Sequence, residues 1–302
     1  MNITFRQLKV FEAVARHLSY TQAARELYLS QPAVSMQIKQ LEDNVGLQLL
    51  EQLGKKTYLT EAGKEMYRYA RSIARELTEA DAIMEQLKGV ETGRLEVTVA
   101  TTANAFATRM LAKFKKQHKG VTISLGVTNR ERLLYQLAEN EKDIAIMGRP
   151  PDDADLVTEP FADNPLVVVA APDHPLAREE KIPLHKLQDQ TFVVREQGSG
   201  TRTAMQRFFD EHKLSITSSM EMNENEAIKQ SVQAGMGLGI VSIHTIELEL
   251  ETKRLVILNV EDFPIMRHWY LVHRKDKRLS PIAQEFRKFV LSSANEFVKV
   301  NY

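Results

Sequence analysis

Polar side chains at helical spacing mark a stretch near the start of the chain, TQAARELYLSQPAVSMQIKQL at 21–41. It predicts two short helices joined by a tight turn at residues 28–30. Ser30 can accept an orphan backbone N–H as the N-cap of the second helix, and Pro32 then falls in its first turn, where a missing N–H is harmless. Two helices joined in this way are a common arrangement for placing one of them in a DNA groove.

The second of these helices has one apolar and one polar face. Val34, Ile38, Leu41 and Val45 recur at steps of three or four residues, which predicts a buried stripe. Amide and hydroxyl groups on the opposite face can pair with base edges in the major groove, and lysines can reach phosphates. An ordinary helical hairpin with a solvated polar face would show the same spacing, so the pattern alone leaves both interpretations open.

A small basic hairpin is predicted directly after this helix, in LQLLEQLGKKTYLT at 47–60, with residues 54–56 at its tip. Beside a recognition helix, a basic tip is a wing that touches the phosphate backbone or the minor groove, although a solvated surface turn would carry the same charges. Gln31 and Ser35 are the first candidates for reading bases, and the lysines for binding phosphates. The expected DNA-binding residues are Ser30, Gln31, Pro32, Ser35, Gln37, Lys39, Lys55 and Lys56.

A long amphipathic helix is predicted from Glu61 to Lys88, capped by Thr60, and would span roughly 40 Å. Its apolar residues alternate in steps of three and four, which is a heptad seam that favours pairing with a second copy of the chain. Such a dimer would offer two recognition helices to two half-sites, whereas a long helix packed on its own domain would show the same stripe. The predicted seam is Met66, Ala70, Ile73, Leu77, Ala80, Met84 and Leu87.

After a short GVETG segment at 89–93, strands at 94–101, 121–128 and 144–148 alternate with two helices. This order implies a parallel sheet with right-handed crossovers. Ligands of such sheets bind beyond the carboxyl ends of the strands. The side chains expected there are polar, and one is cationic: Thr101, Thr102, Asn104, Thr128, Asn129 and Arg149.

The stretch TFVVREQGSGTR at 191–202 predicts a strand, a loop and the start of a helix in a second α/β lobe. Backbone N–H groups and hydroxyls around Ser199 and Thr201 could hold an anion there. Arg195 and Arg202 could add paired contacts to a phosphate or carboxylate. A plain strand-to-helix turn with surface arginines is the alternative. The remaining members of the expected effector site are Gln197 and Asn223.

Later segments complete the second lobe and return to the first. GMGLG at 235–239 follows a predicted helix and leads into a strand, so it is a tight turn and not a dinucleotide-binding fingerprint, which has the reverse order. RHWYLVHRK at 267–275 predicts a strand that crosses back to the first lobe, followed by a helix from Pro281 to about Asn295. Two lobes joined by crossing strands resemble the periplasmic-binding-protein fold, which closes around a small ligand by hinge motion.

Composition excludes some kinds of site and is neutral on others. The chain lacks cysteine and so has no disulfide or thiolate metal site, which suits a reducing cytoplasm. We expect no signal peptide, because charges interrupt the apolar pattern of the N-terminus, and no membrane span of roughly 20 apolar residues. The histidines form no HExxH motif and there is no GxSxG elbow, so we expect neither a metal nor an enzyme. Basic and acidic residues balance at 40 each, so binding to DNA would depend on where charges lie.

The motifs SQPAVSMQIKQLE at 30–42 and LTEAG at 59–63 resemble those of LysR-type transcriptional regulators in sequence and spacing, and the resemblance covers the whole chain. It implies an all-α winged helix-turn-helix with a long linker helix, then an α/β two-lobed periplasmic-binding-protein-like effector domain, in a dimer or tetramer. The expected boundaries are 1–60 for the winged helix-turn-helix, 61–89 for the linker, 90–93 for a hinge and 94–302 for the effector domain, with lobe I at 94–162 and 267–302 and lobe II at 163–266.

One branch of this family resembles the chain further. SMQIKQLE at 35–42 with EQLGKK at 51–56 is similar to regulators of the operons for ribulose-bisphosphate carboxylase and carbon dioxide fixation. That resemblance implies no cofactor, and as effector a phosphorylated metabolite or NADPH; a plain carboxylate would also suit the arginines. Met36, Leu50 and Gln52 depart from the broad family pattern of arginine, phenylalanine and arginine, so base contacts of those arginines do not carry over.

The function we predict is a metabolite-responsive DNA-binding regulator, in which closure of the lobes changes subunit packing and the bend in promoter DNA. Its expected partners are double-stranded DNA, further copies of itself, a small effector and RNA polymerase, in the bacterial cytoplasm. Three alternatives stay open at this point: a LysR-type regulator that senses an aromatic or amino-acid carboxylate, a solute-binding protein, and an enzyme on the α/β scaffold. A solute-binding protein would explain residues 94–302 but not the helices before them, and turnover of a bound metabolite would support the enzyme.

Overall fold

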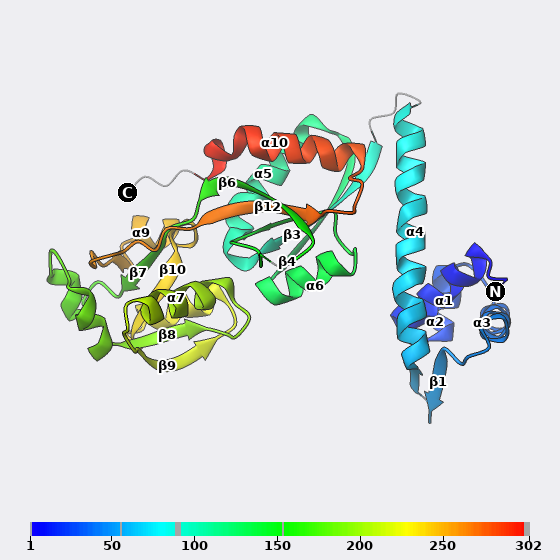
Figure 1. Ribbon diagram of the computed structural model, residues 1–302, viewed down its shortest axis with the longest axis horizontal. Helices are drawn as coiled ribbons and strands as arrows, with labels where there is room; N and C mark the ends of the chain where they lie inside the picture. Colours follow the sequence, from blue (N-terminus) through cyan, green and yellow to red (C-terminus); the bar gives the residue numbers. More distant parts are fainter. Residues whose placement is uncertain (1, 55, 88–91, 153, 299–302) are drawn as a thin grey trace. The chain divides into compact units, whose positions relative to one another are not determined.

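The computed structural model describes residues 2–54, 56–87, 92–152 and 154–298, and the chain divides into two compact units between residues 87 and 88. The first unit is helical apart from a two-stranded antiparallel sheet (Figure 1). Its elements are α1 (Phe5–His17), α2 (Tyr20–Glu26), α3 (Gln31–Val45), β1 (Leu50–Leu53), β2 (Lys56–Leu59) and α4 (Glu61–Leu87).

The first three helices share a small apolar core. Thr4 begins α1 with a capping box, in which its hydroxyl accepts the N–H of Gln7 and the Gln7 side chain accepts the N–H of Thr4. The predicted apolar stripe of α3 is confirmed, because Val34, Ile38 and Leu41 are buried in the core shared with α1 and α2. The packing of this face leaves the opposite face of α3 toward solvent.

The long helix α4 begins where Thr60 caps it. The Thr60 hydroxyl accepts the N–H of Gly63 at 3.0 Å and donates to the carbonyl of Gln48 at 2.7 Å. A Cβ built on Gly63 would lie 1.9 Å from the carbonyl oxygen of Leu49, so only glycine permits this close crossing. From there α4 runs for 27 residues, as its heptad pattern predicts.

The second unit contains two sheets, and the first, that of lobe I, has the strand order β4-β3-β5-β12-β6. β3 is parallel to β4 and β5, as predicted, whereas β12 is antiparallel to β5 and to the edge strand β6, which the periodicity did not predict. The elements of lobe I are β3 (Thr92–Ala100), a 3-10 turn η1 (Thr101–Ala103), α5 (Asn104–Gln117), β4 (Gly120–Thr128), α6 (Arg130–Ala138), β5 (Ile144–Met147), β6 (Leu156–Asp163), β12 (His268–Arg274) and α10 (Pro281–Phe297).

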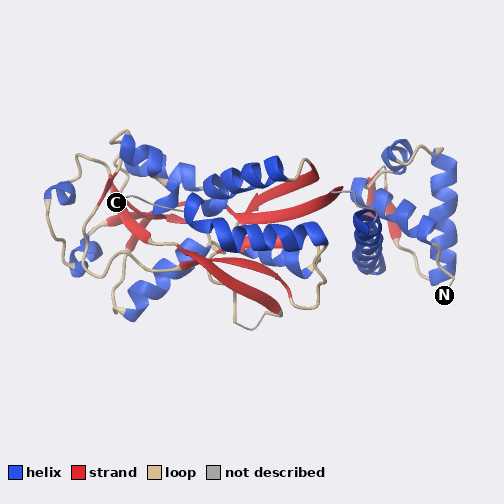
Figure 2. Cartoon of the chain, turned by 90° about the horizontal axis from the view of Figure 1, so that it is seen from above, coloured by secondary structure: helices blue, strands red, loops and turns tan. Residues whose placement is uncertain are grey.

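Helices cover both faces of the lobe I sheet. α5 and α10 lie together on one face and α6 on the other (Figures 1 and 2). Phe114 of α5 and Phe286 of α10 meet edge to face, with ring centroids 5.1 Å apart, over the core that also holds Trp269. Leu133 and Leu137 of α6 are buried against the opposite face. The carboxyl ends of the parallel strands are thereby left as the open edge of this lobe.

Lobe II has the strand order β11-β7-β10-β8-β9. Phe208 and Phe209 of α7 pack on one face of this sheet, and Ile228 and Val232 of α8 on the other. Its elements are β7 (Leu166–Ala170), η2 (Pro175–Arg178), η3 (Leu184–Asp189), β8 (Thr191–Arg195), α7 (Gly200–Glu211), β9 (Thr217–Met222), α8 (Asn225–Gln233), β10 (Leu238–Ser242), η4 (Ile243–Thr245), α9 (Glu247–Glu251) and β11 (Val256–Ile257).

Two segments cross between the lobes, one after β6 and one before β12. The N–H of Asn164 donates to the carbonyl of Arg267 at 2.7 Å, and Leu166 and Ile265 form an isolated antiparallel bridge. The turn at 235–239 joins α8 to β10, as its sequence predicts. This is the connection expected of a two-lobed domain that closes by hinge motion.

The segment expected as a hinge at 90–93 differs from the structure. Residues 88–91 lie outside the described residues, and Thr92 and Gly93 already belong to β3, where they pair with Gly120 and Val121 of β4. The parallel ladder between β3 and β4 therefore begins two residues before the predicted start at 94, and residues 92 and 93 are strand.

Candidate functional site

The helix α3 exposes the polar face from which DNA contacts were predicted. The Ser30 hydroxyl accepts the N–H of Ala33 at 3.3 Å, which confirms the predicted cap, and Pro32 lies in the first turn. Gln37 is half-buried and its side-chain amide donates to that of Gln40 at 3.4 Å. The exposed members of the predicted set on this helix and its cap are Ser30, Gln31, Pro32, Ser35 and Lys39.

Ion pairs fix α2 against α1. The carboxylate of Glu26 accepts hydrogen bonds from Arg16 and from His17, each at 2.6 Å, and Arg16 also bonds Glu12 at 3.1 Å. The hydrogen bond from Arg16, followed by that from His17, lowers the pKa of Glu26 below its ordinary value. These bonds hold α1 and α2 together, and α3 packs against both helices in the shared core.

The predicted wing is a two-stranded hairpin. β1 and β2 pair from Leu50 opposite Leu59 to Leu53 opposite Lys56, and Gly54 turns the chain with φ +65°. Lys56 is exposed, whereas Lys55, also predicted to bind DNA, lies outside the described residues.

A carboxylate on α3 fixes the hairpin in place. Oε1 of Glu42 accepts the backbone N–H groups of Leu49 and Leu50 at 2.8 and 3.1 Å. The entry to the hairpin is therefore tied to α3, so the hairpin and α3 are held together.

The predicted seam of α4 divides into two parts. Met66 and Ala70 pack into the core of the first unit itself, with Ala70 only 1% exposed. The side chain of Leu87 lies outside the described residues. The other members form an exposed apolar stripe: Ile73, Leu77, Ala80 and Met84.

A cavity of about 520 Å³ lies between the two lobes of the second unit. It opens at the carboxyl ends of β3, β4, β5 and β8 and at the N-terminus of α7, where strand-end reasoning predicted a ligand. The predicted effector residues that line it are Thr101, Thr102, Asn129, Arg149, Arg195, Ser199 and Thr201.

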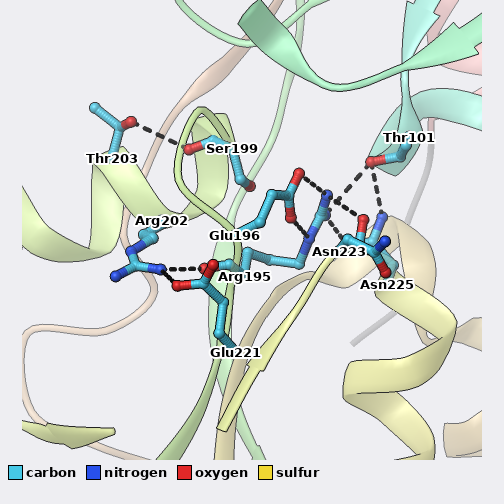
Figure 3. Close-up of polar contacts among 9 residues, drawn as sticks. All are labelled: Thr101, Arg195, Glu196, Ser199, Arg202, Thr203, Glu221, Asn223 and Asn225. Carbon is cyan, nitrogen blue, oxygen red and sulfur yellow. Dashed lines mark hydrogen bonds and ion pairs between the residues drawn. The ribbon is translucent and has the colours of Figure 1, made fainter.

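Arg195 is buried and already bound within the protein (Figure 3). Its guanidinium pairs with both carboxylate oxygens of Glu196 at 2.7 and 3.0 Å, and donates to the side chains of Asn225 at 2.5 Å and Thr101 at 3.4 Å. A further bond reaches the carbonyl of Asn223 at 3.3 Å. Arg195 therefore joins Thr101 of lobe I to lobe II instead of offering a free charge to a ligand.

The N-terminus of α7 opens onto the cavity without a side-chain cap. Ser199 occupies the N-cap position but makes no capping bond, and its carbonyl accepts the hydroxyl of Thr203 at 3.1 Å (Figure 3). Ser199, Gly200 and Thr201 all line the cavity. The first N–H groups of α7 have no partner among the described residues, and together with the helix dipole they can bind an anion.

Three arginines that were not predicted line the cavity: Arg130, Arg207 and Arg267. Arg207 pairs with Glu211 at 3.3 Å, whereas Arg130 and Arg267 make no ion pair with any described residue. Arg267 donates to the carbonyl of Gly200 at 2.8 Å, and its Nε is shielded from solvent without a partner. Burial lowers the pKa of Arg267 to about 10, so it still carries its charge at neutral pH. Arg130 has only a 3.5 Å contact from its Nε to the carbonyl of Arg149.

Comparison with known proteins identifies both units. Residues 5–64 match the family model described as "Bacterial regulatory helix-turn-helix protein, lysR family", and residues 88–295 match that of the "LysR substrate binding domain". The chain belongs to the LysR family of bacterial transcriptional regulators. Its first unit is accordingly a DNA-binding helix-turn-helix, and its second an effector-binding domain.

Individual LysR-family relatives match either nearly the full chain or its effector domain. The RuBisCO operon transcriptional regulator of Allochromatium vinosum is 57% identical over 294 residues, which cover 97% of each chain. Among solved structures, the Synechocystis PCC6803 CcmR regulatory domain in complex with 2-PG is 42% identical with a TM-score of 0.65, and covers 67% of this chain and 97% of that one. Full-length CbnR complexed with its target DNA is 20% identical with a TM-score of 0.73, covers 96% and 100% of the two chains, and shows the shared fold.

This membership confirms the predicted fold class and the prediction that the LysR-family chain is a regulator and not an enzyme. Within the part of the chain that the structure describes, no helix is long and apolar enough to cross a membrane. The same residues contain no group of three or more His, Asp or Glu side chains placed to hold a metal ion.

Several residues predicted for the effector site of this LysR-family domain lie away from the cavity. The side chain of Asn104 accepts the Thr108 hydroxyl at 3.2 Å, on the outer side of α5. Arg202 turns to the carboxylate of Glu221 (Figure 3), and Asn223 contributes only its carbonyl, to Arg195. Strand-end reasoning places a residue near the sheet edge but not the direction of its side chain. The residues outside the cavity are Asn104, Thr128, Gln197, Arg202 and Asn223.

The missed arginines without an ion pair, Arg130 and Arg267, differ in how they could have been found. Arg130 directly follows Asn129 at the carboxyl end of β4, so extending the strand-end set by one residue would have included it. Arg267 lies on a crossing segment, and no local pattern shows that this segment borders the cavity.

Proposed function

We propose that this LysR-family regulator controls carbon-fixation operons and senses a small phosphorylated anion. The observation that best supports the effector is the uncapped N-terminus of α7, which opens onto the cavity beside Arg130 and Arg267. A relative that is 57% identical is named as the regulator of a RuBisCO operon, and a related regulatory domain was solved in complex with 2-PG. We take 2-PG, 2-phosphoglycolate, as the first compound to test and NADPH as the second.

We further propose how the first unit contacts DNA. Gln31 and Ser35, both exposed on α3, read base edges in the major groove, while Lys39 and Lys56 bind phosphates. Lys55 is proposed for the same role from the sequence. Loss of these lysines should weaken binding across all DNA sequences and flatten its dependence on salt.

The functional boundaries proposed are 1–60 for DNA binding, 61–89 for the linker and 92–302 for the effector domain, whose first strand begins at Thr92. Two chains pair through the stripe of α4 that begins at Ile73, and two such dimers form a tetramer on spaced half-sites. The DNA-bound assembly acts in the cytoplasm and contacts RNA polymerase at the promoter.

In the proposed mechanism, the effector binds more tightly when the two lobes are closed. Only this difference in affinity can shift the balance between open and closed forms. Closure of the lobes then changes how the subunits pack, and with it the bend and length of the protected DNA.

The test is a footprint of the full-length protein on the DNA upstream of its own gene and of carbon-fixation operons, at fixed salt. The reactions contain no addition, 2-phosphoglycolate, other sugar phosphates, or NADPH. Two spaced protected half-sites whose pattern shortens with one phosphorylated compound are expected. If none of these compounds alters the protection, the protein is still a DNA-binding regulator but the proposed effector class is wrong. If those promoters are not protected at all, the proposed target operons are wrong.

A further inference from the structure

Arg267 is a cationic side chain that pairs with no carboxylate of the described residues. Its backbone belongs to the crossing segment before β12, where its carbonyl accepts the N–H of Asn164 from the other crossing segment at 2.7 Å. Its guanidinium lines the cavity, and its buried Nε has no partner among the described residues. A buried donor and charge of this kind is unfavourable unless something else binds it.

The same guanidinium contacts both lobes. One of its terminal nitrogens donates to the carbonyl of Gly200, the first residue of α7 in lobe II, at 2.8 Å. It also lies beside Gly148, which follows β5 of lobe I: a Cβ built on Gly148 would stand 3.6–3.8 Å from three atoms of the guanidinium, in ordinary van der Waals contact. Arg267 therefore stands where the lobes approach each other, at the anion-binding end of α7.

The other cavity arginines, with one exception, already have a carboxylate. Arg149 pairs with Asp152 at 3.0 Å, Arg207 with Glu211 at 3.3 Å, and Arg195 with Glu196 at 2.7 Å. The exception is Arg130 at the start of α6, which makes no ion pair with a described residue.

Arg130 faces the same end of α7 from lobe I. The end of its aliphatic chain lies 3.5 Å from where a Cβ on Gly200 would stand. Two uncompensated positive charges, one from lobe I and one from the crossing segment, thus converge on the first turn of α7. A monocarboxylate would compensate one of them, whereas a phosphate monoester carries close to two negative charges and three acceptor oxygens.

We propose that Arg267, together with Arg130, recognises the phosphate group of the effector, and that the effector is a phosphate monoester and not a monocarboxylate. This inference rests on the proposed function. Because Arg267 lies on a crossing segment and touches both lobes, a phosphate that binds it also holds the lobes at their closed spacing.

The test is calorimetric titration of the full-length protein and of the variants R267Q, R130Q and R202Q with 2-phosphoglycolate, glycolate and inorganic phosphate. Arg202 is the matched control. It lies in the first turn of α7, on which Arg130 and Arg267 converge, but its own guanidinium binds Glu221 outside the cavity. We expect the affinity for 2-phosphoglycolate to fall at least tenfold in R267Q and several-fold in R130Q. In R202Q it should hardly change. Glycolate should bind far more weakly than 2-phosphoglycolate to the unmodified protein and should lose little further in R267Q.

Thermal unfolding without ligand separates recognition from a structural role. If Arg267 serves the ligand, R267Q should unfold at the same or a higher temperature than the unmodified protein, because it removes an uncompensated charge. The rise in melting temperature caused by 2-phosphoglycolate should disappear. A lower melting temperature in R267Q with an undiminished response to 2-phosphoglycolate would overturn the proposal.

The titrations distinguish an error in the effector class from an error in the role of Arg267 and Arg130. If the unmodified protein binds none of the phosphorylated compounds, the proposed effector class is wrong. If it binds 2-phosphoglycolate and R267Q and R130Q bind it equally well, only the assignment of these arginines is overturned. Should R267Q fail to fold, R130Q, at a half-exposed position in the other lobe, gives the deciding result.

Discussion

Gly63 shows how a single residue sets the geometry of the DNA-binding unit. In G63A, the added methyl would stand 1.9 Å from the Leu49 carbonyl oxygen, so α4 must move away from the loop that leads into β1. Overpacking of this kind typically costs about 1–3 kcal/mol, and here the neighbour is rigid backbone. We expect a lower melting temperature of the first unit and weaker DNA binding.

The matched control for Gly63 is K64A, at the next position of α4. Lys64 is exposed and, among the described residues, forms an ion pair with Glu61 alone, so its replacement should change stability by less than about 0.5 kcal/mol. Equal melting temperatures for G63A and K64A, measured by circular dichroism on the full-length protein, would contradict the role given to the glycine.

At this scale the sequence predicts residues whose partners are close in the chain. Ser30 caps α3 and Thr60 caps α4 because a hydroxyl and the N–H three residues later need no distant information. Arg195 shows the limit: the sequence places it in the cavity, but its bond to Thr101 joins residues 94 positions apart. Whether a charge is used by the fold or left for a ligand depends on such distant partners.

Among the elements, the joint between α1 and α2 should depend on pH. The hydrogen bonds from Arg16 and His17 lower the pKa of Glu26 below its ordinary 4.5. A carboxyl group whose pKa is lowered by folding contributes stability that is fully present above about pH 4.5. This stability is lost as pH falls through the lowered pKa. The pair is largely exposed, so the contribution is at most about 1 kcal/mol.

The pH prediction is measured on E26Q. Melting temperature against pH should fall less steeply below pH 4.5 in E26Q than in the unmodified protein, while the two curves run parallel above it. The matched variant E12Q removes only the second, more distant partner of Arg16 and should keep most of the acid dependence. If melting temperature falls equally steeply below pH 4.5 in E26Q and in the unmodified protein, the bonds of Glu26 to Arg16 and His17 do not contribute to stability.

The exposed stripe of α4 predicts an interface between copies of the chain. Leu77 is 44% exposed in the middle of this stripe, and L77D would place a charge in the apolar seam of the dimer. T78D introduces the same residue one position further, on another face of the helix, and is the control. Sedimentation equilibrium should show dissociation of the dimer for L77D but not for T78D. If the L77D dimer is as stable as that of the unmodified protein, α4 does not form the interface.

Elements were predicted wherever the apolar pattern was regular. The parallel strands β3, β4 and β5 alternate with α5 and α6 as their sequences indicate. β6 was not predicted, because its sequence LVTEPFAD lies at a sheet edge, is only partly buried and contains a proline that edge strands tolerate. Its pairing partner β12 lies more than 100 positions later in the chain, so only the folded lobe shows why this segment is extended.

For the effector domain as a whole, function depends on how closely the lobes approach. Gly198, with φ +82°, belongs to the loop before α7 and lies against α6 of lobe I, where a Cβ would be 2.7 Å from Oε2 of Glu131. In G198N the larger side chain must push the Glu131 side chain aside and occupies the space in which the two lobes meet. The closed form becomes less favourable, so we expect effector affinity to fall several-fold while DNA affinity without effector is unchanged.

Gly235 supplies a control that separates this effect from backbone strain. It has φ +77°, close to that of Gly198, but has open space where its Cβ would stand, and it lies outside the cavity. Asparagine tolerates the left-handed region better than most residues, so G235N carries the same local strain as G198N without an obstacle to closure. The dose of 2-phosphoglycolate that changes the footprint should therefore rise in G198N and not in G235N. An equal rise in both would assign the effect to strain in the loops, and no rise in either would mean that the cavity binds its ligand without the lobes meeting at Gly198.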